Sequence, residues 1–192
     1  MTYYIKLGVI LFMIAAIASG VLAFVNNFTK PIIEENQRQM EIEARRTVLP
    51  QAKTFEYVED NLPYYRGYDE EGQLVGYTFM AVGAGYSGDI QTMVGLTADY
   101  KIFSISVLIQ TETPGLGANC TRPEFTNQFS GKEVDELYID VDSGDIDNIT
   151  GATITARALT NSVKKASDII IEQTKDLSDN TKHDYSKDKE TA

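Results

Sequence analysis

The sequence predicts an α+β fold, in which an antiparallel sheet with flanking helices follows one N-terminal transmembrane helix and a helical stalk. Three observations predict it: a charge-free apolar run near the N-terminus, short glycine-bounded or alternating segments in the middle, and helical spacing of apolar residues after position 153. A period of two marks strands, and a period near 3.6 marks helices. The expected parts are an N-terminal flank (1–6), a transmembrane helix (7–25), a stalk (26–50), a folded domain (51–175) and a polar, disordered tail (176–192).

Residues 7–25 carry no charged side chain. A helix of this length spans roughly 28 Å, close to the thickness of the hydrocarbon core of a bilayer. A cleaved signal peptide usually has a shorter apolar core of about 7–15 residues, so we prefer a retained single-pass anchor. Lys6 on one side and Lys30 and Arg38 on the other leave the orientation open by charge alone. The short flank 1–6 is easily left in the cytoplasm, which would place the bulk of the chain outside.

The stalk is expected to begin as a new helix after the membrane run. Thr29 is placed to cap it, with Pro31 in its first turn. Residues 32–48 are charged with sparse apolar positions, and Pro50 ends the pattern. We therefore expect a helix that packs against the rest of the protein along one face at most.

Three strands and one long helix are predicted in the folded domain. The strands cover 74–82, 90–96 and 102–109, with a turn at 97–100. Consecutive short strands of this kind indicate a meander. In 102–109 strict alternation places Phe103, Ile105, Val107 and Ile109 on one buried face. Residues 153–173 are expected to form a helix that buries Leu159, Val163, Ala166 and Ile170.

The composition excludes several classes of function. Lys plus Arg number 17 against 28 Asp plus Glu, a net charge of −11, which argues against nucleic acid as a partner. Cys120 and His183 are the only residues of their kinds, so no zinc, iron–sulfur or other metal site is expected. Redox chemistry would therefore need an organic cofactor. For Cys120 itself we prefer a partly buried residue to a reactive thiol.

Residues 147–155, DNITGATIT, combine small residues with three threonines immediately before the predicted helix. Small residues let a ligand approach the backbone, and the start of a helix attracts phosphate. The alternative is that Thr150 or Thr153 only caps the helix, which is the commoner role of a threonine at such a place. Chemistry alone leaves both interpretations open and favours the cap.

Two further segments are rich in glycine. Residues 112–118, ETPGLGA, form a loop after a buried strand, and loops of this kind often cover ligands. Residues 83–88, GAGYSG, offer either a bulge or a wall for a flat ring, and Tyr86 either stacks on that ring or fills the core. Neither segment is a phosphate-binding P-loop, and no Rossmann context surrounds them.

Together and in this order, the three segments resemble the FMN-binding domain found in the G subunit of the Rnf electron-transport complex and in the C subunit of the Na⁺-translocating NADH:quinone reductase. The flavinylation motif of that family, D-x-x-[ST]-G-A-[TS], is filled by Asp147, Thr150, Gly151, Ala152 and Thr153. The resemblance implies that 51–175 is an FMN-binding domain and that Thr153 carries covalent FMN through a phosphoester. It also implies that a separate flavin transferase attaches the FMN. The phosphoester would make the chain a phosphoprotein.

The resemblance implies further contacts, partners and a location. Besides Thr153, the expected flavin or phosphate contacts are Asp147, Thr150, Gly151, Ala152, Thr155, Tyr86, Ser87, Glu112, Thr113, Gly115, Leu116 and Gly117, with no catalytic residue assigned. The chain would be an electron-carrying subunit of an Rnf-type ferredoxin:NAD⁺ oxidoreductase, not an enzyme alone. Its partners would be the other membrane and soluble subunits, and its soluble domain would lie on the outer face of the cytoplasmic membrane.

Other functions stay open at this point. They are the C subunit of the quinone reductase, which is typically longer, another outward-facing reductase with the same domain, and a non-redox anchored module for binding or scaffolding. Coupling to Na⁺ or to H⁺ is equally open.

Overall fold

The computed structural model describes the backbone from residue 2 to residue 187 and the side chains from residue 3 to residue 175. The chain divides into two units, residues 1–40 and residues 41–192. The first unit belongs to one long helix, and the second holds the end of that helix, the sheet and everything after it.

Helix α1 (Thr2–Val48) is continuous and contains Pro31 in its interior. The expectation of a separate stalk helix that starts at Thr29 is therefore wrong. Proline lacks an N–H group, so Pro31 removes one hydrogen bond to the carbonyl four residues earlier. The remaining residues of a long helix each add a backbone hydrogen bond, so the loss of one such bond does not divide the helix.

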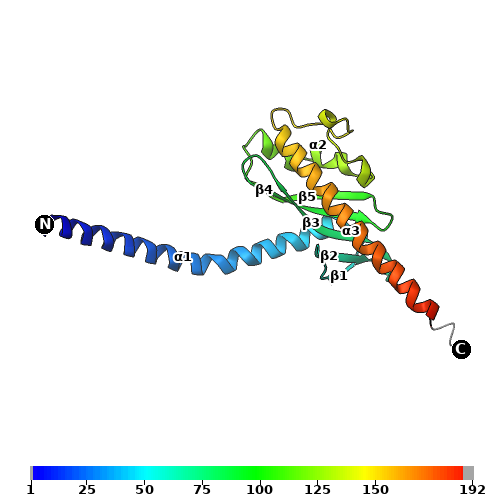
Figure 1. Ribbon diagram of the computed structural model, residues 1–192, viewed down its shortest axis with the longest axis horizontal. Coiled ribbons are helices and arrows are strands. Elements are labelled where there is room, and N and C mark those ends of the chain that lie inside the picture. The colour runs from blue at the N-terminus through cyan, green and yellow to red at the C-terminus, as the bar shows by residue number, and fades with distance from the viewer. Residues whose placement is uncertain (1, 188–192) are drawn as a thin grey trace. The chain divides into compact units, whose positions relative to one another are not determined.

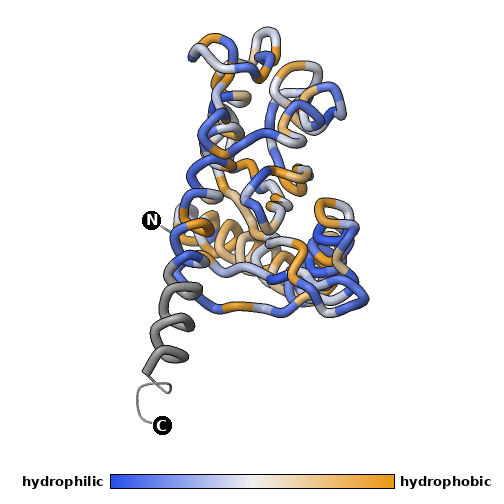
Figure 2. Tube along the Cα trace, turned by 90° about the vertical axis from the view of Figure 1, so that its right-hand side faces the viewer, coloured by the Kyte–Doolittle hydropathy of each residue, from blue (hydrophilic) through white to orange (hydrophobic). Residues whose placement is uncertain are grey.

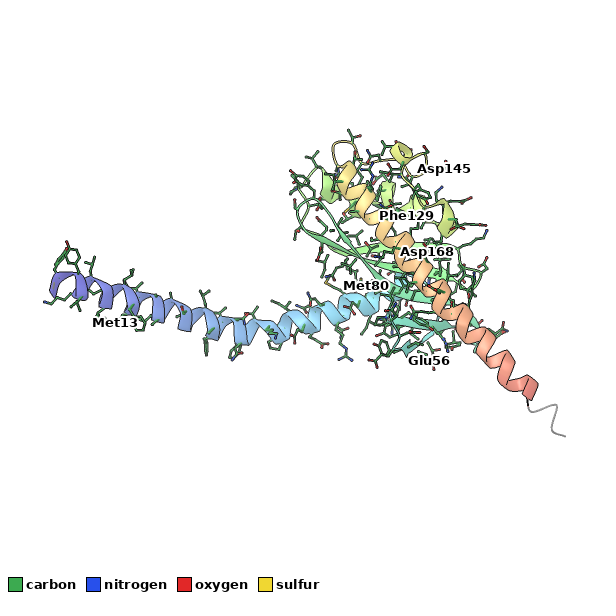
Figure 3. The ribbon with its side chains drawn as sticks, in the orientation of Figure 1. Met13, Glu56, Met80, Phe129, Asp145 and Asp168 are labelled. Carbon is green, nitrogen blue, oxygen red and sulfur yellow. The ribbon has the colours of Figure 1, made fainter. Side chains whose placement is uncertain are left out.

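The N-terminal part of α1 leaves large apolar side chains exposed. Phe12 is 73% exposed and Leu22 is 70% exposed, and Met13, labelled in Figure 3, is 54% exposed. The same stretch is coloured orange, as apolar, in Figure 2. By length and composition, α1 is able to cross a membrane.

Five antiparallel strands form the sheet, in the order β1-β2-β3-β4-β5 (Figure 1). Each strand pairs with the next strand along the chain, so the predicted meander is confirmed. The strands are β1 (Thr54–Val58), β2 (Tyr64–Tyr68), β3 (Leu74–Ala84), β4 (Asp89–Thr97) and β5 (Ile102–Ile109).

Strand β5 does not alternate as its sequence suggests. Ile102 and Ser104 pair with the adjacent residues Leu96 and Gly95 of β4, which leaves Phe103 as an extra residue. A second shift of register occurs further along the same strand. A bulge of this kind switches the face on which the following side chains lie. The expectation of one buried face with Phe103 on it is therefore wrong: Ile102 and Ile105 are buried, and Phe103 is half-buried.

Helix α3 (Thr153–Lys187) packs on β3 and covers one face of the sheet (Figure 1). Its four predicted core positions, from Leu159 to Ile170, are all buried. Gly83 of β3 permits this close packing, since a Cβ atom there would lie 2.6 Å from the carbonyl oxygen of Ala158. The sequence placed the end of this helix near residue 173, which is too early. The backbone of α3 extends into the predicted tail as far as Lys187, and residues 188–192 lie outside the described part of the chain.

The last turns of α1 lie on the other face of the sheet. Ala44, Val48 and Met93 form a small buried cluster, and Met80, labelled in Figure 3, packs against it. Gly95 makes this contact possible, because a Cβ atom there would overlap the carbonyl of Val48. The sheet therefore has a helix on each face within residues 41–192.

The connection from β5 to α3 is more structured than the predicted loop. It holds η1 (Gly117–Thr121), α2 (Pro123–Thr126), η2 (Asn127–Phe129), η3 (Val134–Glu136) and η4 (Asp140–Asp142). Phe125 and Phe129 pack edge to face at 5.6 Å between ring centroids and join the main core. Phe129 is labelled in Figure 3. Such short helical turns have no long period, so sequence patterning did not indicate them.

The thiol of Cys120 is fully buried in this connection, at 0% exposed. Burial, together with the nearby charge of Glu112, raises its pKa to about 11. Only the thiolate is nucleophilic, so we expect native Cys120 to resist a thiol reagent and to react after unfolding in urea. The double variant Cys120→Ala/Thr121→Cys, which moves the thiol to an exposed neighbouring position, is expected to react in the native state. Equal rates for the native protein and this variant would contradict the buried placement.

Candidate functional site

A pocket of about 550 Å³ lies at the N-terminal end of α3. This volume falls within the roughly 300–1,000 Å³ of typical small-molecule sites. Its walls come from three segments that are distant in sequence: the turn between β3 and β4, the loop after β5, and the start of α3. The lining residues are Tyr86, Glu112, Thr113, Leu116, Gly117, Gly151, Ala152, Thr153, Ile154 and Thr155.

Most of the residues that the sequence singled out meet at this pocket, and some do not. Ser87, Gly115, Asp147 and Thr150 are outside its lining. Ser87 still contributes through its backbone N–H group, as described next. Ile154 lines the pocket but was not predicted. The sequence offered one signal, an apolar residue in the first turn of the predicted helix, and the structure leaves its side chain 53% exposed.

Glu112 connects the three segments. Its Oε2 accepts a hydrogen bond of 2.5 Å from the hydroxyl of Thr155 on α3. Its Oε1 accepts one of 2.8 Å from the backbone N–H of Ser87 in the turn between β3 and β4. Its own N–H donates to the side chain of Gln110 at 2.7 Å, which fixes the start of the loop. One side chain, 5% exposed, therefore ties together the walls of the pocket.

The environment keeps Glu112 ionised at neutral pH. Burial acts to raise the pKa of its carboxyl group. The hydroxyl of Thr155 and the backbone N–H groups of Ser87, Tyr86 and Gly88 outweigh burial, so the pKa falls below the ordinary 4.5. A carboxylate that accepts several hydrogen bonds is stabilised in its charged form even when it is buried.

Two glycines of the motifs make room for this carboxylate. A Cβ atom on Gly85 would lie 2.5 Å from Oε1 of Glu112. A Cβ atom on Gly117 would lie 2.5 Å from Oε2 of Glu112 and 2.8 Å from the hydroxyl oxygen of Thr155. Any side chain at either place would displace Glu112. The hydrogen-bond network itself therefore explains why both positions require glycine.

Thr153 is the first residue of α3, and it does not occupy the N-cap position. The carbonyl of Ala152 accepts the first helical bond, from Ala156 N–H at 3.0 Å, so Ala152 is the cap residue. The hydroxyl oxygen of Thr153 instead accepts a hydrogen bond of 2.7 Å from the side chain of Asn148. Thr150, two residues before the cap, is exposed. The interpretation that either threonine only caps the helix does not fit this arrangement.

The start of α3 is suited to a phosphate group. The N–H groups of Thr153, Ile154 and Thr155 belong to the first turn, where no helical carbonyl is available to them. The helix dipole adds positive potential at the same place. Ala152 has no side-chain acceptor to occupy these donors. Gly151, at φ 76°, holds a left-handed conformation that favours glycine just before the helix.

The rim of the pocket is apolar and exposed. Tyr86 is 72% exposed, Ile154 53% and Leu116 44%. Exposed apolar groups around a pocket with a few convergent polar groups are typical of sites for flat organic cofactors. The residues present therefore fit FMN: phosphate donors at the helix start, and an apolar rim for the ring system.

Two polar contacts were missed by sequence reasoning. Asn148 occupies a variable position of the motif, and only its hydrogen bond to Thr153 shows its importance. Asp147, a fixed position of the motif, is exposed, and its N–H donates to Gln128 at 2.6 Å. Asp147 thus helps to hold the segment before α3 through its backbone.

The fold and the pocket define the class of an FMN-binding domain that follows an apolar N-terminal helix. The FMN-binding domain family matches residues 85–168, and the family described as the RnfG N-terminal region matches residues 4–48. A solved structure of the C subunit of the Na⁺-translocating NADH-quinone reductase from Parabacteroides distasonis has the same fold. It aligns with a TM-score of 0.54 at 19% identity, over 70% of this chain and 93% of that one.

Relatives along nearly the whole chain identify the family. The G subunit of the ion-translocating oxidoreductase complex of Methanosarcina acetivorans is 34% identical over 88% of this chain and 95% of its own length. The G subunit of the Na⁺-translocating ferredoxin:NAD⁺ oxidoreductase complex of Acetobacterium woodii is 37% identical, over 82% and 87%. The proton-translocating counterpart from Clostridium ljungdahlii is 34% identical, over 78% and 82%. The chain belongs to the family of G subunits of the Rnf ion-translocating oxidoreductase complexes.

The network around Glu112 leads to a prediction about stability. Glu112→Gln keeps the shape of the side chain but removes its charge, so it is expected to lower the free energy of unfolding by about 2 kcal/mol at neutral pH. The pKa is depressed in the folded state, so this contribution is present above pH 4.5 and is lost as the pH falls through the lower folded value.

Urea unfolding of the full chain in detergent at pH values of about 7 and about 3 tests this prediction. Glu59→Gln, at an exposed glutamate, serves as the matched control and is expected to change little. If Glu112→Gln lowers the free energy of unfolding equally at both pH values, the assigned role of the ionised carboxylate is contradicted.

Proposed function

We propose that this protein is the electron-carrying subunit of an Rnf-type ferredoxin:NAD⁺ oxidoreductase and that FMN is joined through its phosphate to Thr153. The observation that carries the proposal is the position of the Thr153 hydroxyl, in the wall of the pocket at the first residue of α3. Membership of the G-subunit family supports the role in electron transport.

The residues of the pocket would divide the binding of FMN among them. The hydroxyl oxygen of Thr153 would carry the phosphoester, and the free N–H groups of the first turn of α3 would hydrogen-bond its remaining oxygens. Tyr86, Leu116 and Ile154 would pack against the ring system. When bound, FMN supplies the capacity to accept and release electrons, and the protein supplies position and environment.

Attachment would be a phosphoryl transfer from FAD. The bond from the Thr153 oxygen to the phosphorus next to the riboflavin part forms, and the pyrophosphate bond to AMP breaks. The hydroxyl proton leaves to a base, which we assign to a separate flavin transferase. Asn148, 2.7 Å from the hydroxyl oxygen, would hold that oxygen in place before the transfer.

The apolar part of α1 and the family support a membrane anchor. Residues 7–25 contain no ionisable side chain, so we assign this subunit to electron transfer and the ion path to other subunits of the complex. We also infer that the FMN domain lies on the outer face of the cytoplasmic membrane. Covalent attachment would then keep the cofactor from being lost where no free pool replaces it.

Intact-mass spectrometry tests the attachment. After co-expression with a flavin transferase, the chain is expected to gain about 438 Da, the mass of FMN less water. Thr153→Ala is expected to lack this mass and to stay folded, since Thr153 is not the cap residue and its loss should cost no more than about 1 kcal/mol. Thr153→Ser keeps the hydroxyl and should retain the mass.

Thr54→Ala serves as the control, at an exposed threonine outside the motif and outside the pocket lining, and it should keep the added mass. Circular dichroism on each variant verifies folding. A Thr153→Ala chain that still gains the flavin mass would refute the assigned position. A wild-type chain without the added mass would favour a non-redox anchored module.

A further inference from the structure

A second polar site lies on the opposite face of the sheet, at the end of α1. Arg45 is 8% exposed, and its Nε atom has no hydrogen-bond partner. Its guanidinium lies over the ring of Tyr65, 3.4 Å from the ring centroid. Among residues 3–175, no carboxylate lies within 4.0 Å of Arg45.

A buried arginine without an anion is unusual. Its guanidinium stays charged at any physiological pH, and a buried charge is costly unless it is paired. The ring of Tyr65 offsets part of this cost through a cation–π contact. Most buried arginines also have a carboxylate or phosphate partner, because the planar group matches such anions. The missing partner indicates an anion from outside residues 3–175.

A cavity of about 230 Å³ adjoins this arginine. Its walls include Glu41, Arg45, Tyr57, Tyr65, Met80 and Gln91, all within residues 41–192. It shares no lining residue with the FMN pocket. The cavity is smaller than the roughly 300–1,000 Å³ of sites for drug-sized ligands, so it suits a group of side-chain size.

We propose that this cavity binds a single carboxylate group, paired with Arg45. The amide of Gln91 and the hydroxyl of Tyr57 are neutral donors in the same wall, and Met80 and the tyrosine rings suit the short apolar stem of such a group. A doubly charged phosphate is disfavoured, because the carboxylate of Glu41 stands in the same wall. The carboxylate comes either from a small organic acid or from an acidic side chain of a neighbouring subunit.

Glu41 provides the rival explanation. It lies four residues before Arg45 on α1, an arrangement that favours an ion pair along a helix. In the structure the two side chains line one cavity without forming that pair. If Glu41 is the true counter-ion, removing its charge should destabilise the protein. If an external carboxylate is the partner, Glu41 repels it, and removing the charge should strengthen binding.

Thermal unfolding of the full, flavinylated chain in detergent distinguishes the two explanations. The probes are sodium propionate and its neutral isostere propionamide, at constant ionic strength maintained with sodium chloride. We expect propionate, and not propionamide, to raise the Tm of the wild-type protein in a saturable manner. Glu41→Gln should lower the apparent Kd for propionate by about twofold or more.

Arg45→Met keeps the bulk of the side chain and removes its charge. It should abolish the response to propionate without lowering the Tm in the absence of propionate, because an unpaired buried charge is lost. Equal responses of the wild type to propionate and propionamide would overturn the proposal, and so would a Glu41→Gln variant that is less stable and no more sensitive. If Arg45→Met does not fold, the two probes on the wild type and Glu41→Gln still decide.

Purification of the assembled complex distinguishes the two possible sources of the carboxylate. If an acidic side chain of a neighbouring subunit is the partner, a tagged Arg45→Met chain should co-purify with fewer subunits than the wild type. If a small acid is the partner, the complex should stay intact, and only the Tm response should change. The FMN mass serves as a separate readout in both cases, since the two pockets share no residue.

Discussion

The carboxylate of Glu112 accepts one hydrogen bond from a hydroxyl group of α3 and another from a backbone N–H group of the turn between β3 and β4, while its own backbone starts the loop after β5. Thr155 is 43 residues from Glu112 along the chain, and Ser87 is 25. Without this interaction, three segments that are distant in sequence would have no common anchor. With it, the start of α3 and the apolar rim are held around one pocket, and Gly85 and Gly117 are required because any Cβ atom would displace the carboxylate.

The sheet acts as a scaffold with two different faces. On one face α3 covers the main core, and its first turn opens into the proposed FMN pocket, beside the turn between β3 and β4 and the loop after β5. On the other face the end of α1 packs on β3 and β4 through Gly95 and leaves Arg45 beside a small cavity. This division separates the proposed cofactor pocket from the cavity that we assign to a carboxylate partner.

Much of the fold was predictable because its main elements are periodic. The strands 74–82 and 90–96 and the core face of α3 follow directly from alternation and helical spacing. In strand β5 Ile105 is buried as predicted, but Phe103 does not share its face, since a bulge at Phe103 leaves no trace in the hydrophobic pattern. Pro31 was expected in the first turn of a new helix, but one missing hydrogen bond does not interrupt a long cooperative helix. The three motifs that the sequence singled out each contribute residues to one pocket. Asn148 and Arg45 were not found, since their importance depends on neighbours that only tertiary packing supplies.

The most direct test of the account is to locate the flavin on the wild-type chain by tandem mass spectrometry. Trypsin cleaves after Lys132 and Arg157, so one peptide, 133–157, holds Thr150, Thr153 and Thr155 together. Fragment ions from cleavage between these threonines separate the three positions. The account predicts that the phosphoryl-flavin mass first appears in the fragment that includes Thr153. A flavin on Thr150 or Thr155, or an unmodified peptide from a protein that was co-expressed with its transferase, would contradict it.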